Sequence, residues 1–166
     1  VLVSGSTLTI NEVGLGISTI TVTASDGTLT VDNVFSVDVN NVNDAPVIDN
    51  AVADQVLSEH FTSTDIALVG VFSDPDGDVL TLTAVTGNPD VVTVNVIGTT
   101  LTITEIGLGS TNITVTASDG TLSTDDVFAV AVNNVNDAPV VTNPVDNQVL
   151  NEHFSETTIS LIGVFT

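Results

Sequence analysis

Apolar and hydroxyl residues alternate along most of this chain with a period of two. The pattern is clearest in Leu-Thr-Leu-Thr at 80–83, Leu-Thr-Ile-Thr at 101–104 and Ile-Thr-Val-Thr-Ala at 113–117. Such alternation, rich in β-branched residues, is typical of half-buried antiparallel strands, and no stretch has the 3.6-residue period of a helix. In the middle of the chain we expect seven strands, near 47–57, 65–72, 79–85, 91–97, 100–104, 111–117 and 124–133.

Breaks rich in Gly, Pro and Asp separate these expected strands. They include Asp-Pro-Asp-Gly-Asp at 74–78, Gly-Asn-Pro-Asp at 87–90 and Ser-Asp-Gly at 118–120. These residues favour turns because they tolerate or preset unusual backbone angles. Seven short strands in about 90 residues predict an all-β fold, an immunoglobulin-like β-sandwich.

One 93-residue pattern runs through the chain twice without an insertion or deletion. The string Asn-Asn-Val-Asn-Asp-Ala-Pro occupies residues 40–46 and returns at residues 133–139. A fixed period of this kind indicates a tandem array of domains. We therefore expect residues 1–43 to be the C-terminal part of one repeat, residues 44–136 a complete repeat, and residues 137–166 the N-terminal part of the next.

The two copies together orient the last strand. Residues 34–39 are Val-Phe-Ser-Val-Asp-Val and residues 127–132 are Val-Phe-Ala-Val-Ala-Val. Ser36 and Asp38 must face solvent, so the apolar residues that alternate with them, Phe35, Val37 and Val39, face the core. The same register predicts buried side chains at Phe128, Val130 and Val132, with Phe72 as a second aromatic anchor and Phe61 near a domain end.

Charge narrows the set of possible partners. The chain has no Lys or Arg against 21 Asp plus Glu, a formal net charge of −21. Nucleic-acid binding is excluded because no cation displaces phosphate counterions, and an anionic membrane surface is disfavoured. No apolar run approaches the ~18 residues of a membrane helix, and no Cys is present for disulfides. We expect an acidic surface on a secreted or cell-surface protein.

Acidic and amide residues recur in each repeat at fixed places. The linker carries Asn41, Asn43 and Asp44, and an Asp-rich stretch follows at 74–78; isolated acidic residues are Glu59, Glu105 and Asp119. Hard oxygen ligands of this kind suit Ca²⁺. The Asp-rich stretch is not an EF-hand loop, because its sixth and twelfth positions are both valine. Taken alone, it fits a solvated turn as well as a metal site.

In order and spacing this set resembles the ligands of the cadherin family, most closely the bacterial dystroglycan-type cadherin-like repeats of large surface proteins. Asn41-Val42-Asn43-Asp44 resembles the linker motif, and Asp74-Pro75-Asp76 resembles the Asp-x-Asp about thirty residues later. Ala117-Ser118-Asp119-Gly120 is similar to the later Asp turn, and Glu59 and Glu105 are similar to the glutamates that serve the following linker. The sequence departs from the family at Asn41, which replaces an Asp.

The resemblance implies Ca²⁺ at each interdomain junction. The ligands of the first junction would be Glu12, Asn41, Asn43, Asp44, Asp74, Asp76 and Asp119. The ligands of the second would include Glu59, Glu105, Asn134, Asn136 and Asp137. Asp26, which corresponds to Asp119 one repeat earlier, and Asp78 are further candidate metal ligands.

Catalysis finds no support in the sequence. No Ser lies in a Gly-x-Ser-x-Gly nucleophile elbow, and carboxylate pairs without aromatic sugar-stacking residues make a poor glycosidase. His60 and His153, one per repeat, are too few for a transition-metal site and are expected at the surface or at a domain end. We therefore expect that this chain is not an enzyme.

These features predict a structural extender repeat of an extracellular adhesin or surface filament, stiffened by Ca²⁺ at its junctions. The expected partners are neighbouring repeats of the same polypeptide or filament, with cell-surface or matrix ligands as further candidates. Two alternatives stay open. One is a carbohydrate- or protein-binding module. The other is a self-assembling fibre subunit in which chains complete each other's domains, although residues 139–166 and 1–43 together would lack the Asp-rich loop.

Overall fold

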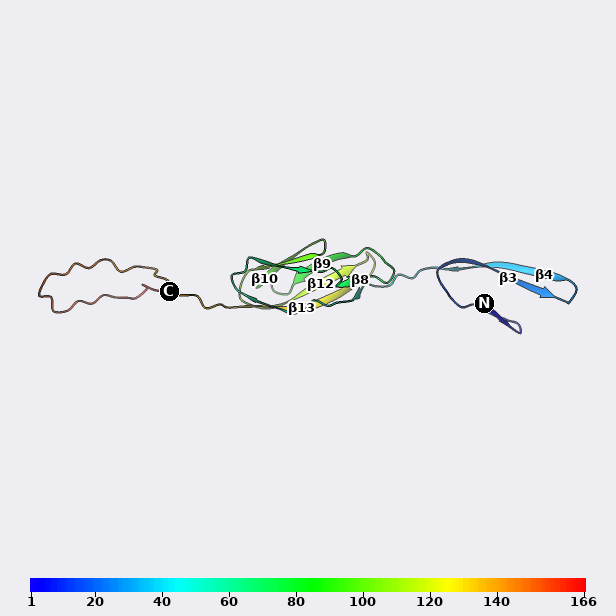
Figure 1. Cartoon of the computed structure of the whole chain (residues 1–166), viewed down its shortest axis with the longest axis horizontal. Helices are drawn as coiled ribbons and strands as arrows, with labels where there is room; N and C mark the ends of the chain where they lie inside the picture. Colours follow the sequence, from blue (N-terminus) through cyan, green and yellow to red (C-terminus); the bar gives the residue numbers. More distant parts are fainter.

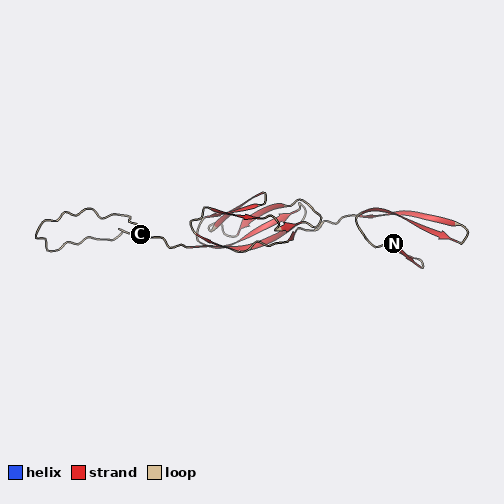
Figure 2. Cartoon of the chain, in the orientation of Figure 1, coloured by secondary structure: helices blue, strands red, loops and turns tan.

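The computed structural model describes residues 1–166, and every regular element in it is a β-strand. Three parts follow one another along one long axis: a hairpin segment near the N-terminus, a central sandwich, and a C-terminal segment made mostly of loop (Figures 1 and 2). Narrow connections join the three parts. None of its elements is a helix that could span a membrane.

The central part is a β-sandwich of two sheets. The larger sheet has the order β6 (Gln55–Ser58), β13 (Ser123–Asn133), β12 (Gly109–Ser118) and β9 (Thr81–Thr86). The smaller sheet has the order β10 (Val92–Ile97), β11 (Thr100–Glu105) and β7 (Ser63–Ala67). β6 pairs with β13 in parallel, and the other pairs are antiparallel. This confirms the all-β sandwich predicted from the alternation of residues.

Alternate side chains of both sheets meet in one hydrophobic core. Phe128 is its largest fully buried side chain, with 2 % of its surface exposed. As the register predicted, Val130 and Val132 are buried beside it, whereas Phe61 and Phe72 are half-buried against the core. The other fully buried large side chains are Leu101, Ile103, Ile113, Val92 and Val115.

Two of the seven expected strands are divided in the structure. The segment expected at 47–57 forms β5 (Val47–Ile48), which pairs with β8 (Phe72–Ser73), and then β6, which pairs with β13. The segment expected at 65–72 forms β7 and β8, separated by a turn in which Gly70 has a φ of 76°. Each division lies where the chain exchanges one pairing partner for another.

Two carboxylates hold the crossing between β5 and β6 in place. Asp126 is only 5 % exposed, and its Oδ2 accepts a hydrogen bond from the backbone N of Val52 at 2.7 Å. The Oδ1 of Asp54 accepts one from the backbone N of Ala129, also at 2.7 Å. The first bond satisfies a backbone donor between β5 and β6, and the second ties the same crossing to β13, one residue before its pairing with β6 begins.

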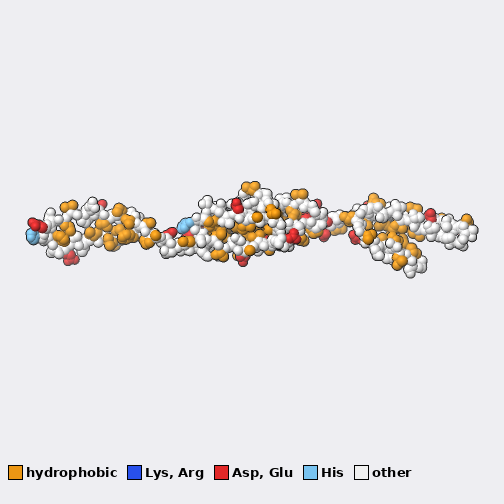
Figure 3. Space-filling model, in the orientation of Figure 1, with side chains coloured by type: hydrophobic (Ala, Val, Ile, Leu, Met, Phe, Trp, Pro, Cys, Tyr) orange, Lys and Arg blue, Asp and Glu red, His pale blue; other side chains and the backbone are white.

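The flanking segments repeat parts of the sandwich. β3 (Gly16–Ser25) and β4 (Thr30–Val39) form a long hairpin that corresponds to β12 and β13, and β1 (Leu2–Ser4) pairs with β2 (Thr7–Thr9). In residues 139–166 the only strand-like pairing is one bridge between Val141 and Phe165. Both segments expose large apolar side chains (orange in Figure 3).

Cross-strand hydrogen bonds hold several acidic side chains on the sheet surfaces. The Oγ1 of Thr116 donates to Asp125 at 2.6 Å, and one repeat earlier Thr23 donates to Asp32 at the same distance. Thr102 donates to Asp65 at 2.7 Å. Paired threonine hydroxyls therefore stabilise carboxylates in a chain that has no Lys or Arg to neutralise them.

Candidate metal site at the interdomain junction

Antiparallel pairing gathers three separate segments at the end of the sandwich that faces the hairpin. Ser118, the last residue of β12, pairs with Ser123 of β13 and with Thr81 of β9. The turn at 119–122 therefore lies next to the loop that precedes β9. Val47 pairs with Ser73, so the linker enters the sandwich beside the start of the same loop. Figure 3 shows acidic side chains beside this narrow connection.

The loop at 74–78 folds around the carboxylate of Asp74. Its Oδ1 accepts hydrogen bonds from the backbone N of Asp76 at 2.9 Å and of Asp78 at 3.2 Å. Gly77 has a φ of 82° and donates its N–H to the Asp74 carbonyl at 3.1 Å. A left-handed φ of this kind favours glycine, which explains Gly at this point of the Asp-rich stretch.

The second carboxylate oxygen of Asp74 is left without a partner. Asp74 Oδ2 is buried and is the only buried side-chain polar atom in the structure that makes no hydrogen bond. Carboxylate oxygens of Asp74, Asp76 and Asp78 lie within 4.8 Å of one another. At an effective dielectric of about 20, two like charges at this separation repel by about 3 to 4 kcal/mol before screening by solvent and salt. The chain offers no Lys or Arg to offset that repulsion.

The linker is fastened to this acidic end by two hydrogen bonds. The backbone N of Asp44 donates to Asp76 Oδ2 at 2.7 Å. The Nδ2 of Asn43 donates to Asp119 Oδ2 at 2.8 Å. The structure therefore brings together Asn43, Asp44, Asp74, Asp76, Asp78 and Asp119, which we call the junction cluster.

The turn that carries Asp119 is shaped by its own carboxylate. Asp119 Oδ1 accepts from the backbone N of Thr121 at 2.6 Å and of Leu122 at 2.7 Å. The side-chain hydrogen bond from Asn43, followed by the bonds from Leu122 and Thr121, lowers the pKa of Asp119 below the ordinary 3.8.

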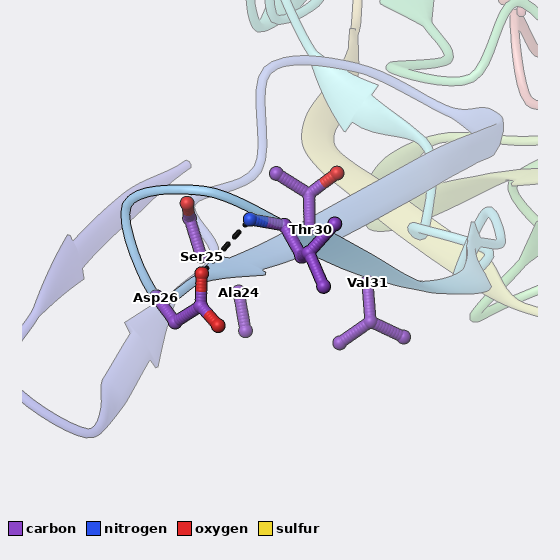
Figure 4. Close-up of a pocket in the computed structure, with 6 residues that line it drawn as sticks. Ala24, Ser25, Asp26, Thr30 and Val31 are labelled. Carbon is purple, nitrogen blue, oxygen red and sulfur yellow. Dashed lines mark hydrogen bonds between the residues drawn. The ribbon is translucent and has the colours of Figure 1, made fainter.

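Asp26 forms the same turn one repeat earlier. Its Oδ1 accepts from the backbone N of Leu29 at 2.8 Å and of Thr28 at 2.9 Å. Figure 4 shows the Asp26 carboxylate with one of these two bonds as a dashed line. These two bonds lower the pKa of Asp26 below 3.8, but no side chain takes the place of Asn43. Asp26 is therefore a natural internal control for Asp119.

Replacing Asn43 with alanine is expected to raise the pKa of Asp119 towards 3.8, because it removes the largest cause of the depression. A depressed carboxylate pKa contributes stability above the unfolded pKa, and that contribution is lost as the pH falls through the folded pKa. In the variant, this contribution should be smaller and should be fully lost at a higher pH, because the folded pKa lies nearer to the unfolded value. NMR titration of the carboxyl carbons in calcium-free protein measures both values. The pKa of Asp26 should not move; equal shifts at both residues, or none at Asp119, would contradict the assignment.

At the second junction, the turn after β6 holds the following linker. Glu59 Oε1 accepts from Asn134 Nδ2 and from the backbone N of Val135, both at 2.6 Å. His60, with a φ of 72°, places its Nε2 at 3.9 Å from Asp137 Oδ2. The His60 contact was not predicted from the sequence. Its signal was present, because Glu and His recur together at 152–153 and His153 repeats the positive φ, at 65°.

Several other predicted ligands lie apart from these contacts. No hydrogen bond or ion pair joins Glu12 or Asn41 to the junction cluster, and Glu12 lines a hollow of the hairpin segment. Glu105 is paired within the β10–β11 ladder, opposite Val92. Asn136 donates its Nδ2 to the neighbouring carbonyl of Asp137 at 3.3 Å, as Asn43 does to Asp44 at 3.2 Å.

The donor set of the junction cluster fits a calcium ion. Five carboxylates and the amide oxygen of Asn43 are hard oxygen ligands, of which Ca²⁺ takes roughly six to eight including waters. The buried, unpaired Asp74 Oδ2 is the kind of polar atom that a cation satisfies. The cluster contains no His and the chain no Cys, so softer metals find no matching ligands there.

Comparisons with solved structures give distant likenesses. An endo-fucoidan hydrolase of glycoside hydrolase family 107 is 24% identical, covering 73% of this chain and 19% of its own, with a TM-score of 0.42. Domains 1–6 of the surface layer protein SbsC are 19% identical, covering 78% and 17%, with a TM-score of 0.43. The PKD domain from the KIAA 1837 protein is 18% identical, covering 59% and 91%, with a TM-score of 0.40.

The chain thus spans about a fifth of the length of the endo-fucoidan hydrolases it matches, 19% and 22%. No curated protein matches this sequence. The family profile described as "Bacterial Ig domain" matches residues 43–132, more than half of the chain and the whole of the sandwich from the linker to β13. This chain belongs to the bacterial Ig domain family.

Proposed function

We propose that this chain is an extender segment of an extracellular surface protein, in which Ca²⁺ at each junction holds successive immunoglobulin-like domains in line. The observation that carries the proposal is the junction cluster. Linker residues Asn43 and Asp44 are hydrogen-bonded to carboxylates of the following domain, beside a buried carboxylate oxygen of Asp74 that has no partner.

A Ca²⁺ ion at the junction cluster would hold the linker against the following domain by electrostatic attraction. Without it, Asp44, Asp74 and Asp76 carry like charges close to a linker held by only two hydrogen bonds. With it, the same carboxylates share a cation, and the linker loses freedom to bend. Extracellular modules bind Ca²⁺ with a Kd of about 10⁻⁴ to 10⁻³ M, which suits a site that remains loaded outside the cell.

The absence of basic residues supports an extended, surface-located role. A net charge of −21 keeps such chains soluble and apart from one another. It also means that mobile cations must neutralise the chain wherever carboxylates converge. We propose that the segment acts mechanically, as a spacer, and that it carries no catalytic step of its own.

Small-angle X-ray scattering tests the proposal. In calcium, the chain is expected to have a longer maximum dimension and a narrower spread of conformations than in chelator, because the linkers stop bending. Asp74→Asn in calcium should scatter like the native chain in chelator. Asp65→Asn, which changes an exposed carboxylate on β7, is the matched control and should respond to calcium normally. Identical dimensions with and without calcium would contradict the proposal.

A further inference from the structure

The turn after β6 contacts the start of the second linker through both its backbone and its side chain. The Glu59 N–H donates to the Asn133 carbonyl at 2.9 Å, directly after the last paired residues of β6 and β13. Glu59 Oε1 accepts from Asn134 Nδ2 and from the backbone N of Val135, both at 2.6 Å. Glu59 is therefore bonded to three consecutive residues at the point where the chain leaves the sandwich.

The chemistry of these bonds favours a contact that holds without a metal ion. Val135 lies beyond the end of β13, so its N–H has no ladder partner and finds an acceptor in the Glu59 carboxylate. Hydrogen bonds to an ionised acceptor are roughly twice as strong as neutral ones. The chain has no Lys or Arg to compete for this carboxylate, and Glu59 is only partly exposed to water.

The turn that carries Glu59 is anchored to the body of the domain. His60 turns the chain with a φ of 72°, and Phe61 is half-buried against the core. His60 Nε2 lies 3.9 Å from Asp137 Oδ2, but both side chains are mostly exposed, so this pair adds little. The string Glu-His-Phe returns at 152–154, and the positive φ returns with it, at 65°. The sequence thus carries the same turn once per repeat.

The first linker shows the same positions without this contact. Asn41 and Val42 correspond to Asn134 and Val135, and the hydrogen bonds of the first linker to carboxylates begin only after them, at residues 43–44. Val42 is 80 % exposed, whereas Val135 is 41 % exposed. The two linkers therefore separate two contacts: the turn of the preceding domain holds the first half of a linker, and the junction cluster of the following domain holds the second half.

We propose that Glu59 is a positioning residue that fixes the first half of the following linker without calcium, and that calcium acts only on the second half. The inference rests on the proposed function in giving this contact a share of the stiffness of the same junction. The resemblance to cadherin-like repeats implies that Glu59 is a metal ligand, but its Oε1 is already engaged by two N–H donors. Loss of calcium would then free the linker only beyond Val135, and the direction in which it leaves β13 would be kept.

Backbone ¹⁵N relaxation of the full chain in chelator tests this assignment on the picosecond-to-nanosecond timescale. In the native chain, the heteronuclear NOE of Val135 is expected to approach that of the β13 amides, and that of Val42 to be clearly lower. Glu59→Ala should lower the value at Val135 to that at Val42, because both hydrogen bonds are lost. Glu59→Gln should keep most of the order, because its carbonyl oxygen still accepts from both donors.

Glu152→Ala is the matched control. It removes the same side chain one repeat later, where no hydrogen bond to residues 134–135 is lost, so the relaxation of these residues should not change. The amide signals of β12 report whether each variant remains folded. Equal NOE values at Val42 and Val135 in the native chain would overturn the proposal, as would a Glu59→Ala variant that relaxes like the native chain in chelator.

A calcium titration distinguishes the positioning role from a ligand role. The Val135 amide signal should stay in place while the signals of residues 43–44 move. A Val135 signal that moves along the same saturable curve would overturn the metal-independent role of Glu59. If calcium leaves residues 43–44 unchanged and Glu59→Ala still frees Val135, the proposed function fails and the positioning role of Glu59 stands.

Discussion

Phe128→Ala is expected to remove about 3 to 5 kcal/mol from the unfolding free energy of the sandwich. Phe128 is the largest fully buried side chain, and removing a core phenylalanine forfeits its transfer free energy and leaves a cavity between the sheets. Domains are stable by roughly 0.05 to 0.15 kcal/mol per residue, so a domain of about 90 residues loses between about a quarter of its stability and all of it.

The same substitution one repeat earlier provides the matched control. Phe35 occupies the corresponding position of β4, but there it is only half-buried in a hairpin without a covering sheet. Phe35→Ala should leave the main unfolding transition almost unchanged. Urea unfolding followed by far-UV circular dichroism measures both variants, since the chain has no Trp or Tyr. Equal losses for Phe35→Ala and Phe128→Ala would contradict the assignment of the core to the central repeat.

Asp74→Asn is expected to weaken calcium binding about tenfold to a hundredfold, because affinity follows the number of charged ligands. The effect of this substitution on stability is also expected to have opposite signs in chelator and in saturating calcium. In chelator the variant should be at least as stable as the native chain, because Asn keeps an oxygen for the N–H groups of Asp76 and Asp78 while one repelling charge disappears. In saturating calcium it should be less stable.

Calorimetric titration and thermal unfolding measure these two effects together. Ligand binding adds about 2.7 kcal/mol to the native state at a free calcium concentration of about 100 times Kd. Asp65→Asn removes a carboxylate of the same domain that bonds to Thr102 and lies outside the cluster. If Asp65→Asn lowers the affinity as much as Asp74→Asn, calcium binds the surface diffusely and the junction cluster is not its site.

The sandwich was predictable because its strands carry their own signal. Apolar and hydroxyl residues alternate in β11 and in the part of β12 from Ile113 onwards, and the structure buries the apolar face as expected. The divisions within 47–57 and 65–72 were not predictable in the same way. They arise because the chain pairs first with one distant strand and then with another, and no local residue pattern encodes that exchange. Asp126 accepts a hydrogen bond from the backbone N of Val52 at one of these divisions. In the sequence, nothing distinguishes it from a solvent-exposed acidic residue.

The candidate site was predictable in part for a different reason. The resemblance to cadherin-like repeats placed Asp74, Asp76 and Asp119 together with Asn43 and Asp44, and the strand pairing brings their turns to one end of the sandwich. Glu12 lies in the preceding hairpin segment and Asn41 near the start of the linker, so their positions relative to the junction cluster depend on the angle between repeats rather than on any strand ladder. The contact of Glu59 with Asn134 could be expected, because both are predicted ligands of the second junction. The hydrogen bond from the backbone N of Val135 to Glu59 could not be expected.

Titration of calcium into the ¹⁵N-labelled chain, followed by NMR, tests the junction most directly. The account predicts that amide signals of residues 43–44, 74–78 and 119–122 move together along one saturable curve, with a Kd of about 10⁻⁴ to 10⁻³ M. Signals around Asp65 and Asp125 should stay in place, and magnesium should not reproduce the changes because it holds its own waters more firmly. Shifts spread over all exposed carboxylates in proportion to calcium, with no saturation at the junction cluster, would contradict the account.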